Sequence, residues 1–268
     1  MKKIHLLLWA ACAFCLPAHA DNVLIVHGLS TTSEINTTQA NIDNWPVVCN
    51  AQGQHTITYA DTPPASLAGY QQIWDIRFSN TSPLTAGDMT AYTAALSSGA
   101  SLFLMGENSS FMTRNDSLFQ FVDQAGGGQL TFDGSAESAQ TVHAPLDANG
   151  LTSLTFPASG SATAVGLTGI MATVATNTGN SGTTFVWPHG TLANAPAGKL
   201  TMVLDVNFMM PGYADDGNGQ LFANLCEFMA TPQPPAAVQP VPTLGGWAMA
   251  ALLGLLGLTA ARARRRPR

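Results

Sequence analysis

The sequence predicts an α/β fold: a layered sheet with an inserted β-rich lobe, between an N-terminal signal peptide and a C-terminal transmembrane helix. Three observations support this prediction. Short apolar runs alternate with helix-like segments from Val23 to Gly128 and again from Lys199 to Met229. Residues 129–190 are instead rich in Thr, Ser, Gly and Ala, with short hydrophobic runs typical of strands and loops. Each end of the chain carries an apolar run beside basic residues.

The first half of the body, residues 21–230, predicts a β-α-β-α succession. Thr85–Asp88 opens a helix that Gly99 ends, and Asn115–Asp116 caps a second helix that stops at Gly126. Gly219–Met229 is predicted as the closing helix because its apolar residues fall on one face. The predicted strands are Val23–Val26, His55–Tyr59, Gln72–Phe78, Ser101–Met105 and Lys199–Val206.

The charge of the chain is concentrated in particular regions. Charged residues make up only 10% of the 268 residues, and seven of the ten basic ones lie near the two ends. Only Arg77, Arg114 and Lys199 lie between the ends, against sixteen acidic residues. A body with this balance offers no basic patch to a phosphate backbone, so we exclude nucleic acid as a partner.

Residues 1–20 have the layout of a secretory signal. Lys2 and Lys3 give the positive start, Ile4–Leu16 the apolar stretch, and Ala18–Ala20 a small-residue cleavage site. We therefore expect recognition by the export machinery and cleavage by signal peptidase after Ala20.

The C-terminal region has three parts. A proline-rich linker covers 231–242, an uncharged apolar run of 18 residues covers 244–261, and a cluster of arginines follows. The positive-inside rule places this cluster in the cytoplasm and the body outside it. The run is predicted to be a single transmembrane helix.

This tail resembles the bacterial sorting signal called IPTL-CTERM, which is related in layout to PEP-CTERM signals. The motif residues are Val241, Pro242, Thr243, Leu244 and Trp247 within 241–268, with Val in place of the preferred Ile and Gly246 where Glu is common. The resemblance implies an exported protein of a Gram-negative bacterium, held at the inner membrane. It also implies recognition by an exosortase-like sorting protease near Pro-Thr-Leu, with anchoring or release to the surface or matrix both open.

Two cysteines remain after signal removal, Cys49 and Cys226. In an oxidising compartment they suggest one disulfide, and the alternative is two buried free thiols. No Cys/His spacing suggests a zinc site.

The body resembles the class I glutamine amidotransferase-like superfamily, and thus a flavodoxin-like layered sheet. The resemblance rests on a first strand ending near His27-Gly28 and a strand-turn-helix around Gly106-Glu107-Asn108. It also rests on a last strand with Asp205-Val206-Asn207 before a helix containing Phe222-Ala223-Asn224-Leu225. Catalytic members place a cysteine on the turn after the central strand, and this turn has none. The resemblance therefore implies a core without the nucleophile, and we interpret Ser109 or Ser110 as a helix cap.

The candidate catalytic group is Glu107, because ligands of α/β folds bind at the carboxyl ends of the strands. It could act as an acid or base with His27 or His189, or its carboxylate could simply be satisfied by backbone N–H groups. Asp215 and Asp216 lie in an acidic, glycine-rich loop that could hold Ca²⁺, although the EF-hand series is incomplete and a plain turn is the alternative.

We therefore expect an exported cell-envelope or extracellular protein whose core is a non-catalytic binding or structural module. The alternatives are an envelope hydrolase using Glu107, and a Ca²⁺-dependent adhesion module. No cofactor is expected, and the sequence identifies no envelope ligand.

Overall fold

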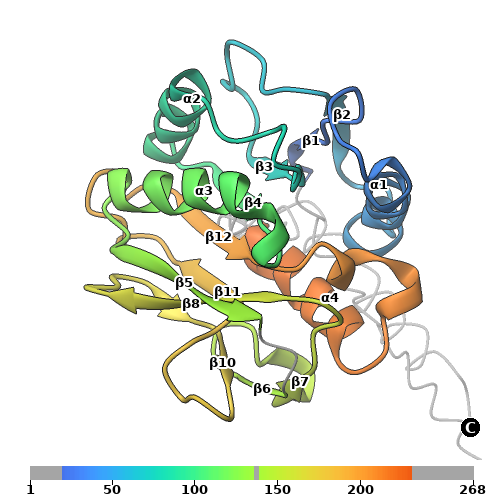
Figure 1. The fold of residues 1–268 in the computed structure, drawn as a ribbon. Coiled ribbons are helices and arrows are strands. Elements are labelled where there is room, and N and C mark those ends of the chain that lie inside the picture. The colour runs from blue at the N-terminus through green and yellow to red at the C-terminus, as the bar shows by residue number, and fades with distance from the viewer. Residues whose placement is uncertain (1–19, 136–138, 231–268) are drawn as a thin grey trace, which may run out of the picture. The chain divides into compact units, whose positions relative to one another are not determined.

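A seven-stranded sheet forms the centre of the computed structural model, which describes residues 20–135 and 139–230 (Figure 1). The first five strands in spatial order are parallel, and the last two are each antiparallel to their neighbour. The α/β prediction is confirmed. Across the sheet the strands are β2 (Thr56–Ala60), β1 (Asn22–Val26), β3 (Gln72–Asp75), β4 (Ser101–Met105), β12 (Lys199–Val203), β11 (Thr184–Trp187) and β9 (Ile170–Met171).

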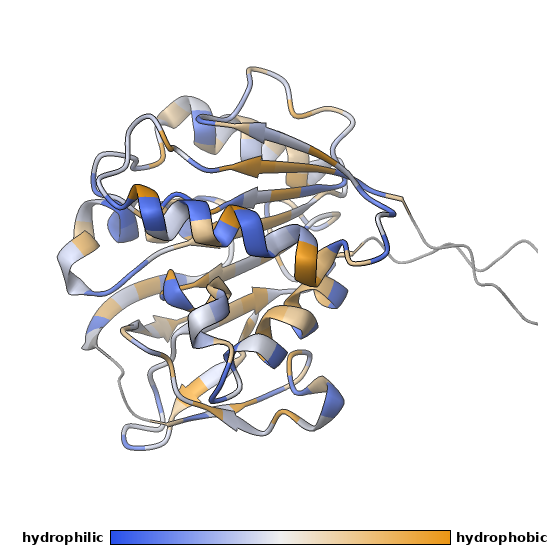
Figure 2. Cartoon of the chain, turned by 90° about the vertical axis from the view of Figure 1, so that its right-hand side faces the viewer, coloured by the Kyte–Doolittle hydropathy of each residue, from blue (hydrophilic) through white to orange (hydrophobic). Residues whose placement is uncertain are grey.

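Helices cover both faces of this sheet (Figure 1). On one face α2 (Ala86–Ser97) and α3 (Met112–Gln124) pack against a cluster that includes Leu24 and Val26. On the other face α1 (Ile35–Cys49) and α4 (Asn218–Met229) pack against a cluster that includes Val23 and Ile25. Successive residues of β1 therefore pack into opposite cores, which is why Val23–Val26 are all apolar. Figure 2 shows the resulting concentration of hydrophobic residues in the central strands.

Helix α2 follows the sequence prediction closely. Thr85 accepts a hydrogen bond from the N–H of Asp88, and the Asp88 carboxylate accepts one from the N–H of Thr85, forming a capping box. After the helix, Gly99 adopts a φ of 93°, a conformation that glycine takes without a steric penalty.

Helix α1 is not evident from the sequence, because it contains Pro46 and its first half is mainly polar. Tertiary contacts stabilise it instead. The Asn41 amide donates to Val206 O at 3.0 Å and the Asn44 amide donates to Met209 O at 2.7 Å. Both bonds attach α1 to the segment that follows β12.

The turn after β4 differs in detail from the prediction. Asn108, rather than Ser109 or Ser110, caps a short 3₁₀ turn (Ser109–Phe111) by accepting from the N–H of Ser110. Helix α3 begins at Met112, so Asn115 lies inside it and is buried. Strand β3 ends at Asp75, three residues before the predicted end.

Residues 129–190 are rich in short strands, but they do not form a wholly separate lobe. Two of their strands, β9 and β11, extend the central sheet. The others form a pair and a three-stranded sheet: β5 (Gln129–Ser135) with β8 (Gly160–Val165), and β10 (Thr173–Ala175) with β6 (Gln140–Val142) and β7 (Ser153–Leu154).

The predicted signal peptide up to residue 19, the linker 231–242 and the sorting signal 241–268 lie outside the described residues. Within 20–135 and 139–230, no helix is long and apolar enough to cross a membrane.

Candidate functional site

The carboxyl edge of the parallel strands gathers most of the buried charged groups. His27 follows β1, Asp75 ends β3, Glu107 follows β4 and Asp205 follows β12. These strands are neighbours in that order, so the four groups form a row across one edge of the sheet. This is the edge at which α/β proteins bind ligands.

Glu107 lies in the middle of this row and is 2% exposed. One carboxylate oxygen accepts from the backbone N–H and the side-chain amide of Asn108, at 3.0 and 2.9 Å, and the other accepts from the N–H of Val206 at 2.6 Å. Asn115 fixes the Glu107 backbone from both sides, because its amide donates to Glu107 O and its oxygen accepts from Glu107 N. Among residues 20–135 and 139–230, the Glu107 carboxylate therefore has amide partners and no histidine partner.

Asp205 is the second buried carboxyl group at this position. Its oxygens accept from the N–H of Asn207 at 2.6 Å and from the N–H of Ala158 at 3.4 Å. Burial raises the pKa of Asp205 to about 6. Burial, together with the nearby charge of Asp205, raises the pKa of Glu107 to about 8. The hydrogen bonds from Val206 and Asn108 oppose this shift without cancelling it.

A buried ionic network lies beside this pair. Arg77 makes two hydrogen bonds to the Asp75 carboxylate, at 2.8 and 2.7 Å, and Arg114 Nη2 lies 3.1 Å from Asp75 Oδ1. The Tyr92 hydroxyl donates to Asp75 Oδ2 at 2.9 Å. Burial alone would raise the pKa of Asp75, but the two guanidinium groups outweigh it and hold this pKa at about 2. The network positions the β3 and β4 ends relative to α2 and α3.

Sequence reasoning did not single out this network as a site. The only available signal was the scarcity of basic residues, since Arg77 and Arg114 are the only arginines between the chain's two ends. The predicted strand Gln72–Phe78 places their partner Asp75 in a strand interior, whereas β3 ends at Asp75 in the structure.

His27 lies on the same edge but interacts with a different group. Its Nδ1 accepts from the N–H of Leu29 at 3.1 Å and lies 3.2 Å from an oxygen of Asp61. Burial lowers the pKa of His27, although Asp61 opposes the shift, so the neutral ring that accepts from Leu29 is favoured. None of the hydrogen bonds to the Glu107 carboxylate comes from His27.

His189 does not lie at this edge. It follows β11, which runs antiparallel to β12, so it lies at the end where β4 and β12 begin. Its Nδ1 lies 2.8 Å from Ala197 O. The fold therefore does not bring Glu107 and His189 together, because the two residues lie at opposite edges of the sheet.

Asp215 and Asp216 lie in an exposed loop before α4. The carbonyl oxygen of Asp215 accepts from the Asn218 N–H at 3.2 Å, which closes the turn. In residues 20–135 and 139–230 there is no group of three or more His, Cys, Asp or Glu placed to hold a metal ion. The loop does border a cavity of about 520 Å³, lined by Thr155, Phe156, Pro157, Gly212, Tyr213, Asp215, Asp216 and Asn218.

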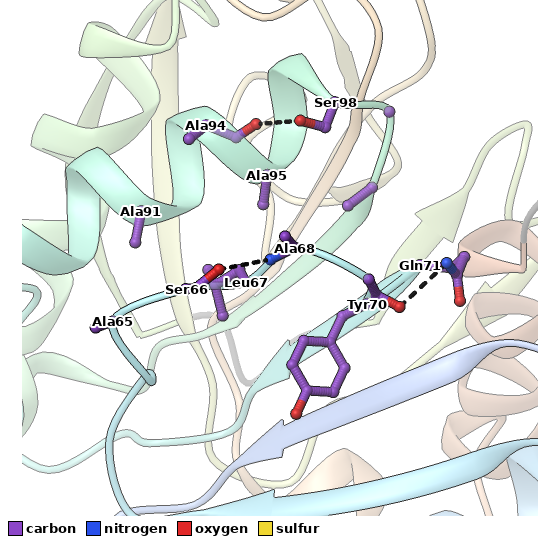
Figure 3. A pocket seen from close by; sticks show the side chains of 13 residues that line it. Ala65, Ser66, Leu67, Ala68, Tyr70, Gln71, Ala91, Ala94, Ala95 and Ser98 are labelled. Atoms are coloured by element: carbon purple, nitrogen blue, oxygen red, sulfur yellow. Dashed lines mark hydrogen bonds between the residues drawn. The ribbon is translucent and has the colours of Figure 1, made fainter.

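A second cavity, of about 450 Å³, lies at the opposite edge, between α2 and the segment before β3 (Figure 3). Ala91, Ala94 and Ala95 form its helical wall, and the Ser98 hydroxyl donates back to Ala94 O at 3.0 Å. Its only titratable side chain is that of Tyr70. Among the residues that the structure describes, no carboxylate, histidine, lysine or arginine side chain lines this cavity.

The predicted disulfide is present. Cys49 at the end of α1 is bonded to Cys226 in α4, with the two Cα atoms 5.2 Å apart. It closes a loop across 177 residues and joins the two helices that cover the same face of the sheet.

Comparisons with known proteins give a fold and no family. No family model and no curated protein matches this sequence. Among solved structures, a ThuA-like protein from Bacteroides uniformis is 13% identical over 81% of this chain and 96% of its own, with a TM-score of 0.54. The mmIFT52 N-terminal domain is 11% identical over 80% of this chain and 99% of its own, at 0.53.

A third structure, the exo-β-1,4-mannosidase Op5Man5 from Opitutaceae bacterium strain TAV5, is 11% identical over 80% of this chain, with a TM-score of 0.51. This chain covers only 36% of that enzyme. At such identities the likeness concerns the fold alone.

Proposed function

We propose that this chain is an exported, membrane-tethered protein of a Gram-negative cell envelope, whose α/β body is a binding or structural module rather than an enzyme. The body is amidotransferase-like in this proposal, a view supported by the likeness to the ThuA-like structure. Sorting at Val241–Leu244, with or without release, belongs to the same proposal.

One observation carries the non-catalytic part. The turn after β4, where amidotransferases hold their nucleophile, presents Glu107, and both of its oxygens are occupied by amide N–H groups. The body's only two thiols are joined to each other in the disulfide and cannot replace that nucleophile. The turn after β4 is therefore present in this fold, but it lacks the nucleophilic cysteine that acyl transfer requires.

Two structural features support export. A disulfide persists in oxidising compartments and is rare in the cytoplasm. Cleavage after Ala20 would also leave the sheet intact, because Ala20 is exposed while Asp21 already accepts a backbone hydrogen bond from Thr56 at 3.0 Å. The first residue of the expected mature chain, Asp21, therefore already contributes a backbone hydrogen bond to the sheet.

The experiment follows the protein in its native host, with an epitope tag in the exposed turn 176–180 between β10 and β11. Cell fractions and the intact mass are measured. We expect a chain that begins at Asp21 and lies outside the cytoplasm, and a mass ending near Pro242 would add release by sorting. A cytoplasmic chain that retains residues 1–20 would refute the proposal.

The hydrolase alternative has one favourable observation, the raised pKa of Glu107, since acid–base groups with shifted pKa values mark active sites. It requires that Glu107→Gln abolish hydrolysis of a panel of nitrophenyl esters and glycosides. The same assay with Asp116→Asn, an exposed carboxylate on α3, is the matched control.

A further inference from the structure

The surface of the body has an unusual charge distribution. All three basic residues of the described chain are buried: Arg77 is 4% exposed, Arg114 is 0% and Lys199 is 6%. No Lys or Arg side chain in residues 20–135 and 139–230 is therefore exposed, and residues 136–138 contain none. The exposed carboxylates are those of Glu34, Asp43, Asp61, Asp116, Asp123, Asp133, Asp147, Asp215, Asp216 and Glu227.

Arg77 and Arg114 are each held by several bonds. Both contact the Asp75 carboxylate, and Arg77 also reaches Asp88 at 3.3 Å. Arg114 lies within α3 and donates to Met105 O at 3.2 Å and to Ser82 O at 2.9 Å. Freeing either side chain would break buried ion pairs, and freeing Arg114 would also require unwinding α3.

Lys199 is the first residue of β12, which lies between two other strands. Its ammonium group donates to Phe228 O, and to Ala230 O at 2.7 Å, at the end of α4. Exposing the Lys199–Leu200 bond would therefore disrupt both the central sheet and the end of the last helix.

From this burial we infer that the folded body is closed to proteases that cut after Lys or Arg. Such a protease must hold the basic side chain in its pocket with the flanking backbone extended, so each of the three bonds requires local unfolding before cleavage. A proline after the basic residue would block cleavage even in an unfolded chain, but the residues that follow are Phe78, Asn115 and Leu200. The protection therefore comes from the folded conformation.

The inference extends to the tether and there rests on the proposed function. Residues 200–261 contain no Lys or Arg, so the connection from the last strand through the expected transmembrane run also lacks a site. A trypsin-like protease outside the cell would neither degrade the body nor detach it. Release would then require a protease of different specificity, such as one that reads Val241–Leu244.

The test is limited proteolysis of the purified full chain in detergent with trypsin, followed by intact-mass analysis. The matched variant is Asn180→Lys, which places one basic residue in the exposed turn 176–180. We expect cleavage of this variant after residue 180, and cleavage of the wild-type chain after 77, 114 or 199 at least about 100-fold more slowly. The reduced chain in urea should yield fragments 78–114 and 115–199.

Native wild-type protein cut at 77, 114 or 199 as fast as the variant is cut at 180 would overturn the inference. A resistant Asn180→Lys protein would also overturn it, because resistance would then not depend on where the basic residues lie. Neither result bears on export, which the mass and cell fraction decide separately.

Discussion

Glu107 accepts a hydrogen bond of 2.6 Å from the backbone N–H of Val206, 99 residues further along the chain. The bond joins the turn after β4 to the turn after β12, the neighbouring strand. It brings Glu107 beside Asp205, and the two buried carboxyl groups raise the question of how the pair responds to pH.

The pKa of Glu107, raised to about 8 from an ordinary 4.5, predicts that the free energy of unfolding falls as pH rises from about 4.5 to about 8. The folded protein holds a proton that the unfolded chain releases, so this contribution is fully present below about pH 4.5. It is lost as pH rises through about 8, at up to about 1.4 kcal/mol per pH unit. The raised pKa of Asp205 acts in the same direction up to about pH 6.

Glu107→Gln should flatten this dependence, because an amide does not titrate. The free energy of unfolding in urea, measured at several pH values between about 5 and 8, gives the slope. Gln also places an amide against an N–H donor, which lowers stability at every pH without changing the slope. Asp116→Asn, an exposed carboxylate on α3, should leave the slope as in wild type; equal slopes for all three proteins would refute the prediction.

Asp75→Asn should destabilise the fold by about 3–5 kcal/mol, because it leaves Arg77 and Arg114 buried without their shared carboxylate. Urea unfolding at neutral pH measures the loss. The control is Asp123→Asn on the exposed side of α3, which should stay within about 0.5 kcal/mol of wild type. A similarly small effect at Asp75 would show that the network contributes little.

Gly160→Ala should also destabilise the region around Glu107. A Cβ at this position would lie 2.7 Å from Glu107 O and 2.7 Å from the ring of Phe132. Overpacking of this kind costs about 1–3 kcal/mol. Gly212→Ala is the comparison, since its Cβ meets nothing within 4 Å; thermal unfolding should separate the two variants, and equal midpoints would contradict the steric argument.

Removing the disulfide with Cys49→Ala and Cys226→Ala should lower stability by up to about 5 kcal/mol, because the bond closes a loop across 177 residues. The double variant avoids leaving one free thiol. Its urea midpoint is compared with that of oxidised and of reduced wild type. The urea midpoint of reduced wild type should equal that of the double variant. If the double variant instead has the midpoint of oxidised wild type, the prediction is refuted.

The regular parts of the fold were readable from the sequence. Val23–Val26 and Leu102–Met105 are apolar at every position, since the residues of a central strand face two cores. Thr85 and Asp88 specify the start of α2 by local hydrogen bonds. Residues 21–230 contain only two cysteines, so the sequence suggested the disulfide between Cys49 and Cys226, and it correctly placed Glu107 after a central strand.

What the sequence by itself determined was thus local: strand and helix patterns, a cap, and the number of thiols. Only the tertiary structure decided α1, which depends on Asn41 and Asn44 contacts with a segment about 165 residues away. It also decided that Asp205 lies beside Glu107 while His189 lies at the far edge, because strand order and direction are set by packing between distant segments. The periodicity of apolar residues predicts helices and strands from residues close together in the sequence. The pKa and the partners of a buried carboxyl group depend instead on residues that are close in space but distant in the sequence.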